Sequence, residues 1–500
     1  MRLKDLLKHI RYLGIADFRD IEIGDVVNDS RHVHPGDVFV AIRGIREDGA
    51  KYASDAAARG AVAVVAEGPV EGINGMPLIV VDDARIALSG LSAAAHDHPS
   101  TKLEIIGITG TNGKTSVSLL IRSILKAAGI EAGLLGTISY DTGLYALPAP
   151  ITTPESSDIQ RYLAQMAACG LTHAVMEVSS HALAQGRVRD VDFDAGVFTN
   201  FSAEHLDYHG DIENYFDAKA ELFRMLKPEA HGIINADDPR AARLAAQTRA
   251  AVTQYGLEHS APVSARIRGV GMTGSDYTLL LDDRAIPVSS PLPGRHNILN
   301  ALAAAAVCLR LGIDAGDIRD GIEAVRAVPG RLERVEAGQP FDVFVDYAHT
   351  EDALNTVLAG VRPLVRGRLI TVFGCGGDRD RSKRAPMAAA AERWSDRVVL
   401  TSDNPRSEDP PAIIEEIRAG FSSSADYVIE PDRAAAIEAA LQTAQPGDLV
   451  LIAGKGHETV QKFADGEIPF DDRAVALRVL EEKKPETSAE EALGLRTIKV

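Results

Sequence analysis

The chain has 500 residues, of which 45% are hydrophobic, and a formal net charge of -18 at pH 7. This length exceeds one typical domain and predicts two to four domains with large cores. The acidic balance argues against non-specific nucleic-acid binding and against an anionic membrane surface, because both favour basic faces. We therefore expect no nucleic-acid partner, and the charge suits a cytoplasmic protein.

Further classes are excluded by what the sequence lacks. The three cysteines form no Cys-x-x-Cys pair, so neither a disulfide framework nor a structural zinc site is indicated. The sequence has no run of 18 apolar residues, and charges are scattered through its first turns. We expect neither membrane insertion nor a secretory signal.

The first ~98 residues are predicted to form a small α/β domain, with strands at 37–42 and 61–65 and a helix at 52–59. The His-Pro-Ser sequence at 98–100 is typical of a linker. A polar cluster at 28–31 follows an apolar stretch. On its own it is more typical of a turn or a helix cap than of a binding site.

A glycine-rich turn lies between an apolar strand and an amphipathic helix within residues 105–128. Glycine lets several backbone N–H groups point at one anion, and the helix adds the positive end of its dipole. We expect Lys114 to reach the β- and γ-phosphates of a nucleotide and the Thr115 hydroxyl to ligate Mg²⁺. Ile108 stands where the usual pattern has glycine, and a turn without a ligand is the disfavoured alternative. The predicted phosphate loop comprises Gly110, Thr111, Asn112, Gly113, Lys114, Thr115 and Ser116.

From residue 101 to about 330, strands and helices alternate, which predicts a mostly parallel sheet covered by helices. Ligands in such sheets bind at the carboxyl ends of strands. Glu177 interrupts the strand 174–178 at such an end and is a candidate Mg²⁺ ligand, with an ion-paired glutamate as the alternative. The histidines and acids of 199–210 fit either a metal site or an ordinary polar loop. We also predict a helix at 217–223, a hairpin over 277–288, a long helix from 294 to about 311 and a hinge at 328–331.

The last third predicts a second, doubly wound α/β domain. Its strands are expected at 341–346, 368–373, 397–400, 427–430 and 448–452. Four polar runs follow such strands and describe the rim of one pocket. The run at 374–380 lacks the dinucleotide fingerprint, so NAD binding is not expected there. The tail after Lys483 is expected to be loosely held. The runs are 346–349, 374–380, 402–406 and 454–458.

Five motifs occur in order along the chain: Gly-Thr-Asn-Gly-Lys-Thr at 110–115, Glu-Val-Ser-Ser-His at 177–181, His-Leu-Asp-Tyr-His-Gly at 205–210, Gly-Arg-His-Asn-x-x-Asn at 294–300 and Asp-Tyr-Ala-His-Thr at 346–350. With this set the chain resembles the Mur ligases, the ATP-dependent amide-bond ligases of bacterial cell-wall synthesis, and within them the UDP-N-acetylmuramoyl-tripeptide synthetase type. The resemblance covers nearly the whole chain and includes the shortened phosphate loop.

The resemblance implies three α/β domains. They are a small N-terminal domain that binds the UDP-linked substrate (1–98), a central P-loop ATPase-like domain with a mostly parallel sheet (99–330), and a C-terminal Rossmann-like, doubly wound domain that binds the amino acid (331–500). It also implies a monomer whose substrates are ATP, a UDP-muramyl dipeptide and an amino acid.

The resemblance further implies roles for individual residues. Thr115 and Glu177 would hold one Mg²⁺ with ATP, and His205 would contribute to the metal site. Lys219, which alone would pass as part of a solvated helix face, resembles the family's carbamylated lysine, whose CO₂ adduct ligates a second Mg²⁺. Lys114, Lys219 and His205 would form the catalytic set. Asn297, Asn300, Arg331 and Asp346 would contact ATP, His349 would belong to the face that closes over it, and Ser30, Thr152, Thr153, Ser179, Gln185 and Arg187 would hold the UDP-linked substrate.

The implied reaction forms an acyl phosphate from a carboxylate and ATP, and an amine then displaces phosphate. The donor would be meso-diaminopimelate, because Asp403-Asn404-Pro405-Arg406 matches the form found in enzymes that add it. A guanidinium can bind the distal carboxylate that lysine lacks. Arg379, Gly454 and Glu458 match the remaining amino-acid contacts.

Two departures and three alternatives accompany this interpretation. Ile151 stands where an asparagine is familiar and affects one substrate contact, and Glu351 stands where proline usually follows the fifth motif. The chain could instead add L-lysine or another diamine, or be a folylpolyglutamate synthetase-like ligase, which would not need 28–31 or 403–406. An inactive nucleotide-binding regulator would be expected to have lost Lys114, Glu177 or Lys219.

Overall fold

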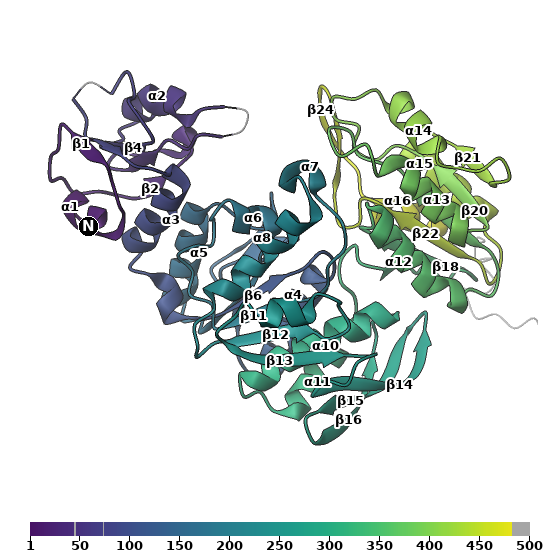
Figure 1. Cartoon of the computed structure of the whole chain (residues 1–500). Helices are drawn as coiled ribbons and strands as arrows, with labels where there is room; N and C mark the ends of the chain where they lie inside the picture. Colours follow the sequence, from purple (N-terminus) through teal and green to yellow (C-terminus); the bar gives the residue numbers. More distant parts are fainter. Residues whose placement is uncertain (45–46, 74, 483–500) are drawn as a thin grey trace, which may run out of the picture.

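The computed structural model describes residues 1–44, 47–73 and 75–482, and the expectation for the tail after Lys483 lies outside them. Three domains follow one another along the chain, each built on its own sheet (Figure 1). Within the described ranges, no helix is long and apolar enough to cross a membrane.

The N-terminal domain has a five-stranded sheet in the order β1-β5-β4-β3-β2. β1 is antiparallel to β5, and the other pairs are parallel. Side chains alternate between the faces of a strand, so Val38 and Val40 join the core under α3 while Phe39 joins the core on the other face. The elements are α1 (Leu3–Leu6), β1 (Gly14–Ala16), β2 (Val26–Val27), β3 (Val38–Val40), α2 (Ala53–Ala58), β4 (Ala63–Ala66), β5 (Leu78–Val80) and α3 (Ala84–Ala95).

The central domain has an eleven-stranded sheet in the order β16-β15-β14-β13-β12-β11-β6-β10-β7-β8-β9. Strands from β14 to β7 are parallel, and the edges β15–β16 and β8–β9 are antiparallel. One core lies under α4, α10 and α11, and the other lies under α5 and α8. The strands are β6 (Glu104–Thr109), β7 (Ala132–Leu135), β8 (Ser139–Asp141), β9 (Ala146–Pro148), β10 (His173–Glu177), β11 (Ala195–Phe198), β12 (His231–Asn235), β13 (Ala251–Gly256), β14 (Val263–Gly271), β15 (Gly274–Leu281) and β16 (Arg284–Ser290).

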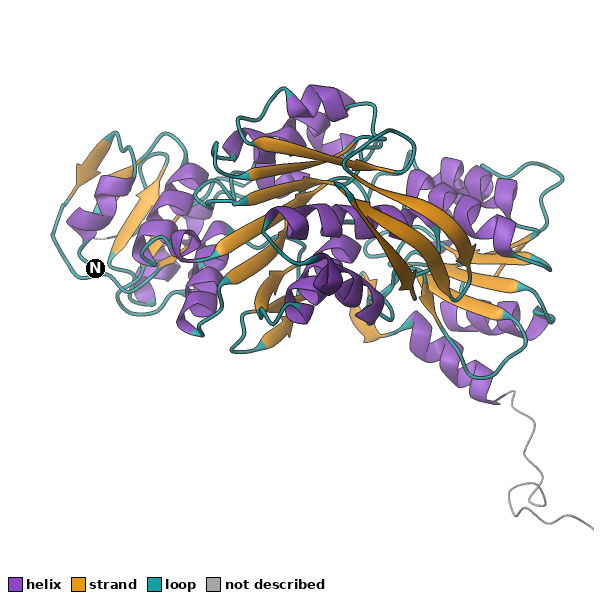
Figure 2. Cartoon of the chain, turned by 90° about the horizontal axis from the view of Figure 1, so that it is seen from below, coloured by secondary structure: helices purple, strands orange, loops and turns teal. Residues whose placement is uncertain are grey.

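The helices of this domain include both long core helices and short turns. They are α4 (Lys114–Ala127), α5 (Ser156–Ala168), α6 (Ser180–Ala184), α7 (Leu206–His209), α8 (Ile212–Met225), α9 (Ala241–Ala245), α10 (Arg295–Arg310) and α11 (Ala315–Ala324). The long strands β14 and β15 reach toward the C-terminal domain (Figure 2). Met272, between them, packs against the core of that domain.

The C-terminal domain has a six-stranded sheet in the order β17-β18-β22-β19-β20-β21. β17 is antiparallel and the other pairs are parallel, with α12, α13 and α14 on one face and α15 and α16 on the other. A separate hairpin, β23–β24, follows. The elements are β17 (Glu333–Arg334), β18 (Asp342–Asp346), α12 (Glu351–Val361), β19 (Leu369–Phe373), α13 (Arg384–Trp394), β20 (Arg397–Leu400), α14 (Pro410–Arg418), β21 (Tyr427–Ile429), α15 (Arg433–Thr443), β22 (Leu449–Ala453), β23 (Val460–Phe463), β24 (Gly466–Pro469) and α16 (Asp472–Glu482).

The structure confirms the predicted α/β architecture, including the mostly parallel central sheet and the doubly wound C-terminal sheet. The hairpin predicted over 277–288 is β15–β16, and the long helix from 294 is α10. Neither the β23–β24 hairpin nor the strand β2 was predicted, because strands of two to four residues are too short to show a periodicity.

Candidate active site

The predicted phosphate loop joins the carboxyl end of β6 to the first turn of α4. Gly113 has φ 88°, and a Cβ there would lie 2.5 Å from Asn300 Oδ1, so glycine is required on both counts. Lys114 Nζ donates to the carbonyls of Gly110 and Thr111, both at 2.8 Å. Burial lowers the pKa of Lys114, although the negative charges of Glu204 and Glu177 raise it in part. The lysine is therefore already folded over the loop where an anion would lie.

Hydroxyl and carboxylate oxygens converge beside the loop. Thr115 Oγ1 donates to Glu177 Oε2 at 3.0 Å, and Thr137 Oγ1 donates to the same oxygen at 2.8 Å. The Thr137 amide donates to Glu177 Oε1 at 2.9 Å. An all-oxygen set of one carboxylate and two hydroxyls is the kind that Mg²⁺ uses together with phosphate oxygens and water. Glu177 forms no ion pair in the described part of the chain, so the ion-paired alternative is wrong.

Lys219, on α8, contacts the start of the loop and is buried, with 2% of its surface exposed. Its interpretation as part of a solvated helix face is therefore wrong. Its Nζ donates to Gly110 O at 2.8 Å and lies 4.4 Å from the centre of the Tyr215 ring. Burial, and then the charge of Lys114, lower the pKa of Lys219 well below its usual value. The neutral amine is thereby favoured.

His205 belongs to a group of aromatic rings beside Lys219. Its ring centre lies 4.8 Å from that of His181, and Tyr208 packs 4.3 Å from His181. Burial lowers the pKa of His205 to about 4, which leaves the ring neutral, as a metal ligand must be. His205 Nε2 lies 3.7 Å from Glu204 Oε1. Among the described residues, no group of three or more His, Cys, Asp or Glu is arranged to hold a metal ion.

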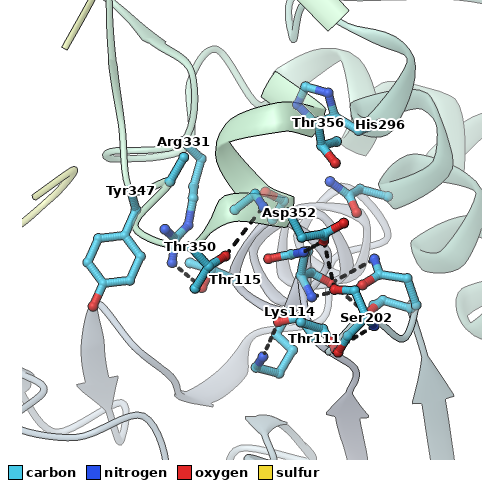
Figure 3. Close-up of a pocket in the computed structure, with 18 of the residues that line it drawn as sticks. Thr111, Lys114, Thr115, Ser202, His296, Arg331, Tyr347, Thr350, Asp352 and Thr356 are labelled. Atoms are coloured by element: carbon cyan, nitrogen blue, oxygen red, sulfur yellow. Dashed lines mark hydrogen bonds between the residues drawn. The ribbon is translucent and has the colours of Figure 1, made fainter. Parts of the chain in front are cut away.

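A cavity of about 520 Å³ lies between the central and C-terminal domains. Figure 3 shows this space lined by residues of both domains, which include Thr111, Lys114, Thr115 and Ser202 of the central domain and Arg331, Tyr347, Thr350 and Asp352 of the C-terminal domain. Arg331 lies 4.3 Å from the Tyr347 ring centre, and its Nη2 donates to Thr115 Oγ1 at 3.4 Å. The cavity has the volume and the mixed polar lining of a nucleotide site.

Two further predicted residues of the C-terminal face line this cavity. Asp346 accepts from the Leu332 amide at 2.6 Å and from the Ala348 amide at 2.8 Å. Burial raises its pKa against the effect of Arg331 and these two amides. His349 Nδ1 donates to Tyr347 O at 2.8 Å, and its Nε2 lies 3.8 Å from Glu204 Oε1. Both side chains therefore have fixed orientations.

The start of α10 also lines this cavity and lies against the phosphate loop, since a Cβ on Gly113 would come 2.5 Å from Asn300 Oδ1. Asn300 Nδ2 donates to Asn297 Oδ1 at 3.1 Å, and Asn297 Nδ2 donates to Pro293 O at 2.8 Å. Both asparagines line the cavity, as does His296, which was not selected from the sequence. The phosphate loop and the predicted adenine contacts thus lie in one cavity.

The residues predicted to hold the UDP-linked substrate form a connected network next to Glu177. Thr153 Oγ1 donates to Glu177 O at 2.9 Å and accepts from the Ser179 amide at 3.0 Å. Arg187 Nη1 donates to Thr153 O at 2.9 Å, and its Nη2 donates to Gln185 Oε1 at 2.7 Å. Thr152 accepts from Thr137 Oγ1 at 3.2 Å, whereas Ser30 lies apart, buried in the N-terminal domain.

The 28–31 cluster lies close to the central domain, although Ser30 itself is remote from Glu177. Asn28 Oδ1 accepts a hydrogen bond from Ser157 Oγ at 3.1 Å, which joins the two domains. Asp29 caps the short 3₁₀ helix that begins at Ser30 by accepting from the Arg31 amide. The cap interpretation of this cluster is therefore confirmed, and its binding role stays a prediction.

The predicted amino-acid residues gather at the carboxyl ends of β19, β20 and β22. Gly454 has φ 115°, and a Cβ there would lie 2.7 Å from Asp403 Oδ2. Asn404 Nδ2 donates to Glu458 Oε2 at 2.7 Å. Arg406, at φ 52°, donates from Nη1 to Gly377 O at 2.8 Å. Both Arg406 and Arg379 lie beside Gly376, where a Cβ would come 2.8 Å from Arg406 Nη1 and 3.8 Å from Arg379 Cγ. Burial, and then the charge of Arg379, lower the pKa of Arg406.

The loop 403–406 is held from behind by β23. Gln461 Nε2 donates to Asp403 O at 2.7 Å, and the Lys462 amide donates to Asn404 Oδ1 at 3.0 Å. The Arg406 amide donates to Lys462 O at 3.0 Å. Pro405 contributes no N–H to this clamp, and its carbonyl lies against Gly377. The three polar runs after β19, β20 and β22 thus contact one another, while the run after β18 lines the nucleotide cavity.

Sequence reasoning missed several residues of this site. Glu204 has a side chain that is 14% exposed and lies among His205, His349, Lys114 and Lys219. Burial raises its pKa, but these four neighbours lower it on balance. Its position directly before the His-Leu-Asp-Tyr-His-Gly motif was the available signal. Thr137 and Asp352 were also missed, because nothing in the local sequence marks them. Lys455 lies in the predicted polar run 454–458 but was not assigned a role.

Family models match three segments of the chain. They are described as Mur ligase family, catalytic domain (residues 22–96), Mur ligase middle domain (108–308) and Mur ligase, glutamate ligase domain (330–456). Together these segments reach from the N-terminal domain to β22 and Gly456 in the C-terminal domain.

Two relatives are similar over nearly the whole chain. A UDP-N-acetylmuramoyl-L-alanyl-D-glutamate--2,6-diaminopimelate ligase of Geobacter metallireducens is 45% identical, covering 97% of this chain and 99% of the relative. A ligase with the same name from Geobacillus thermodenitrificans is 42% identical, covering 97% of this chain and 100% of the relative.

Solved structures agree with these matches. A ligase of the same name is 33% identical with a TM-score of 0.65, covering 92% of this chain and 95% of that one. A folylpolyglutamate synthase of Mycobacterium tuberculosis, complexed with ADP and AMPPCP, has a TM-score of 0.62 at 21% identity and covers 79% of this chain and 95% of that one. At that identity the likeness shows the fold alone.

Proposed function

The chain belongs to the Mur ligase family, and on that premise we propose that it is an ATP-dependent ligase that adds meso-2,6-diaminopimelate to UDP-N-acetylmuramoyl-L-alanyl-D-glutamate. The amide bond forms at the side-chain carboxyl of the D-glutamate residue. The products are ADP, phosphate and the UDP-linked muramyl tripeptide, a precursor of peptidoglycan.

One observation carries this proposal. Relatives with 42% to 45% identity bear the name of this ligase, and the similarity runs through all three domains. The site geometry supports it, because a phosphate loop, a substrate network and a pair of guanidinium groups occur in one chain. Lys114, Glu177 and Lys219 are all present in the site, which argues against an inactive regulator.

The first chemical step joins the substrate carboxylate to the γ-phosphorus of ATP. The carboxylate oxygen forms the new P–O bond, the bond from phosphorus to the bridging oxygen breaks, and ADP leaves. Catalysis of such transfers rests on positioning and on neutralising charge. We assign the neutralisation to Lys114 and Arg331, which approach the cavity from opposite domains.

Mg²⁺ fits the oxygen set described beside the loop. We propose that Thr115 and Glu177 hold one ion, supported by Thr137, and that His205 contributes to the metal site. When bound, Mg²⁺ polarises the phosphoryl oxygens and offsets their charge. Neutral His205 and the buried carboxylate of Glu204 keep this side of the cavity able to accept a cation.

We propose that Lys219 carries a CO₂ adduct. The free amine attacks the carbon of CO₂, an N–C bond forms and a proton is lost, which leaves a carbamate with two anionic oxygens. Only an uncharged amine can do this, and the lowered pKa of Lys219 favours that form. The carbamate would supply the ligand for a second Mg²⁺.

The second step is attack of the donor amine on the acyl phosphate. A C–N bond forms through a tetrahedral intermediate, the C–O bond to phosphate breaks, and the amine loses a proton. We assign the donor site to Arg379, Asp403, Asn404, Pro405, Arg406, Gly454 and Glu458. Arg406 keeps its Nη2 free of protein partners among the described residues, so it can bind a carboxylate.

We further propose domain limits of 1–98, 99–330 and 331–500, because each main sheet and its core lie within one of these ranges. We propose a monomer, because all of the assigned residues come from one chain. We also propose that the reaction takes place in the cytoplasm, because the proposed substrates are nucleotides and nucleotide-linked precursors.

The test measures phosphate release by the purified protein with ATP, Mg²⁺ and the UDP-linked muramyl dipeptide. A panel of amino acids should give release with meso-diaminopimelate far above that with L-lysine or ornithine. A preference for lysine would overturn the donor, and release that required no muramyl nucleotide would overturn the ligase assignment.

A further inference from the structure

Lys455 lies directly after Gly454 and has no exposed side-chain surface. A lysine is almost never fully buried without partners, because its ammonium loses its hydration. Its Nζ donates to Asn404 Oδ1 at 3.0 Å, to Glu458 Oε2 at 3.1 Å and to Val460 O at 2.6 Å. All three N–H groups of the ammonium therefore have protein acceptors.

These contacts fix the orientation of Glu458. Its Oε2 accepts from Lys455 and also from Asn404 Nδ2 at 2.7 Å. Its Oε1 has no protein partner within the described ranges, and 27% of the side chain is exposed. The carboxylate thus presents one oxygen to the donor site and keeps the other inside the protein.

Lys455 also fixes Asn404. Asn404 Oδ1 accepts from Lys455 and from the Lys462 amide, which leaves its Nδ2 facing Glu458. Through this amide the ammonium links the 403–406 loop to the 454–458 loop. The Val460 carbonyl adds the start of the β23–β24 hairpin. One buried cation therefore joins the three segments that surround the amino-acid site.

We propose that Lys455 is a positioning residue for the amino-acid donor. It holds Glu458 so that Oε1 receives an ammonium group of the donor while Arg406 receives a carboxylate. This inference rests on the proposed function. Lys455 does not touch the donor itself, since its ammonium is fully used within the protein.

The test compares Lys455→Met with Lys227→Met, whose parent side chain is exposed and lies 2.9 Å from Asp192, outside the site. In Lys455→Met, Glu458 loses a charged partner and can rotate. We expect kcat/KM for meso-diaminopimelate to fall about 10- to 100-fold, mostly through KM, as expected when a ground-state contact is loosened. The KM values for ATP and for the muramyl nucleotide should stay within about twofold of wild type. Lys227→Met should behave as wild type.

A second readout separates positioning from loss of fold. The acyl phosphate forms without the donor, so hydroxylamine should trap it as a hydroxamate at the wild-type rate in Lys455→Met. If the Met variant does not fold, Lys455→Gln keeps amide donors for two of the three acceptors and should show the same selective rise in KM. Joint loss of hydroxamate formation and of donor use in a folded variant would overturn the inference, as would an unchanged KM for the donor.

A double-mutant cycle tests whether Lys455 affects donor binding through Glu458. If Lys455 acts through Glu458, the change to Met should cost little in a Glu458→Gln background. Equal costs in both backgrounds would contradict the inference. Failure of the wild-type protein to use meso-diaminopimelate at all would instead defeat the proposed function, so the two failures are distinguishable.

Discussion

Ser202 Oγ of the central domain donates a hydrogen bond of 2.7 Å to Asp352 Oδ2 of the C-terminal domain. The same carboxylate oxygen accepts from Asn112 Nδ2, in the phosphate loop, at 3.1 Å. One carboxylate from the first turn of α12 therefore bridges two loops of the neighbouring domain across the nucleotide cavity (Figure 3). Because Asn112 belongs to the phosphate loop, the loop that is proposed to bind ATP is also the loop that contacts this carboxylate.

We predict that Asp352→Ala opens the ligand-free molecule. Loss of both interdomain hydrogen bonds should favour orientations in which the two domains are further apart, and the radius of gyration from small-angle X-ray scattering should rise. Asp320→Ala removes an exposed carboxylate on α11 and should leave the radius unchanged. An ATP analogue with the muramyl nucleotide should compact the wild-type protein. Identical scattering from Asp352→Ala and wild type would show that the bridge does not set the orientation.

We predict that Lys114→Ala and Glu177→Ala each lower kcat by about a thousandfold or more, because both remove groups that stabilise charge on the transferring phosphoryl group. Neither side chain is part of an apolar core cluster, so circular dichroism should show folded proteins. Lys126→Ala changes an exposed lysine of the same helix and should retain activity. Wild-type turnover by either folded variant would refute the phosphate-loop assignment.

We predict that Lys219→Ala is nearly inactive and that short carboxylates in the buffer restore part of the rate. Acetate or formate can enter the space left by the side chain and supply the oxygens of the proposed carbamate. The measurement is phosphate release against carboxylate concentration, with chloride at equal ionic strength as the control. Full activity without any carboxylate would mean that Lys219 has no catalytic role.

We predict that Lys219 makes stability depend on pH. The pKa of Lys219 in the folded chain lies well below its ordinary value of 10.5, so between these two pKa values the unfolded chain binds more protons than the folded one. The free energy of unfolding therefore rises with pH across that window. Lys219→Met removes this contribution and should be more stable than wild type at neutral pH, with a weaker rise toward pH 10. Urea unfolding in CO₂-free buffer from pH 7 to pH 10 measures both slopes, and parallel slopes would contradict the prediction.

We predict that Arg406→Ala lowers kcat/KM for meso-diaminopimelate by about 30- to 1000-fold, because a charge-assisted contact in a desolvated pocket contributes about 2 to 4 kcal/mol. The low rate with lysine should barely fall, and Arg406→Lys should recover little, since a point charge cannot reproduce the planar fork. The decisive quantity is the ratio of the two kcat/KM values. Arg478→Ala, an exposed change on α16, should leave this ratio unmoved.

Much of the architecture could be predicted, because apolar residues recur at regular spacing in amphipathic helices and form continuous runs in buried strands. The strand 448–452 and the helix from Gly294 are examples, and both lie within a residue of the observed β22 and α10. β23–β24 could not be predicted, because its strands are short and partly exposed. Its importance comes from contacts with a loop that lies more than fifty residues earlier.

The site shows the same division. Lys114 and Thr115 could be found from local spacing, because the loop, the helix start and the phosphate-binding side chains are contiguous. Lys219 could not be found from local spacing, because its contact with Gly110 and the Lys114 charge that lowers its pKa come together only in the folded chain. Asp352 is one of two acids at a helix start, and only its distance to Ser202 distinguishes it from Glu351.

The clamp between β23 and the 403–406 loop limits how donor preference can be exchanged between related enzymes. Backbone and side-chain groups of residues 461 and 462 hold Asp403, Asn404 and Arg406 in place. A chimaera that receives residues 403–406 alone would keep the hairpin of the recipient enzyme. The contacts that orient Arg406 would then come from a hairpin with a different sequence. To transfer the donor preference, the loop 403–406 and the β23–β24 hairpin therefore have to be exchanged together.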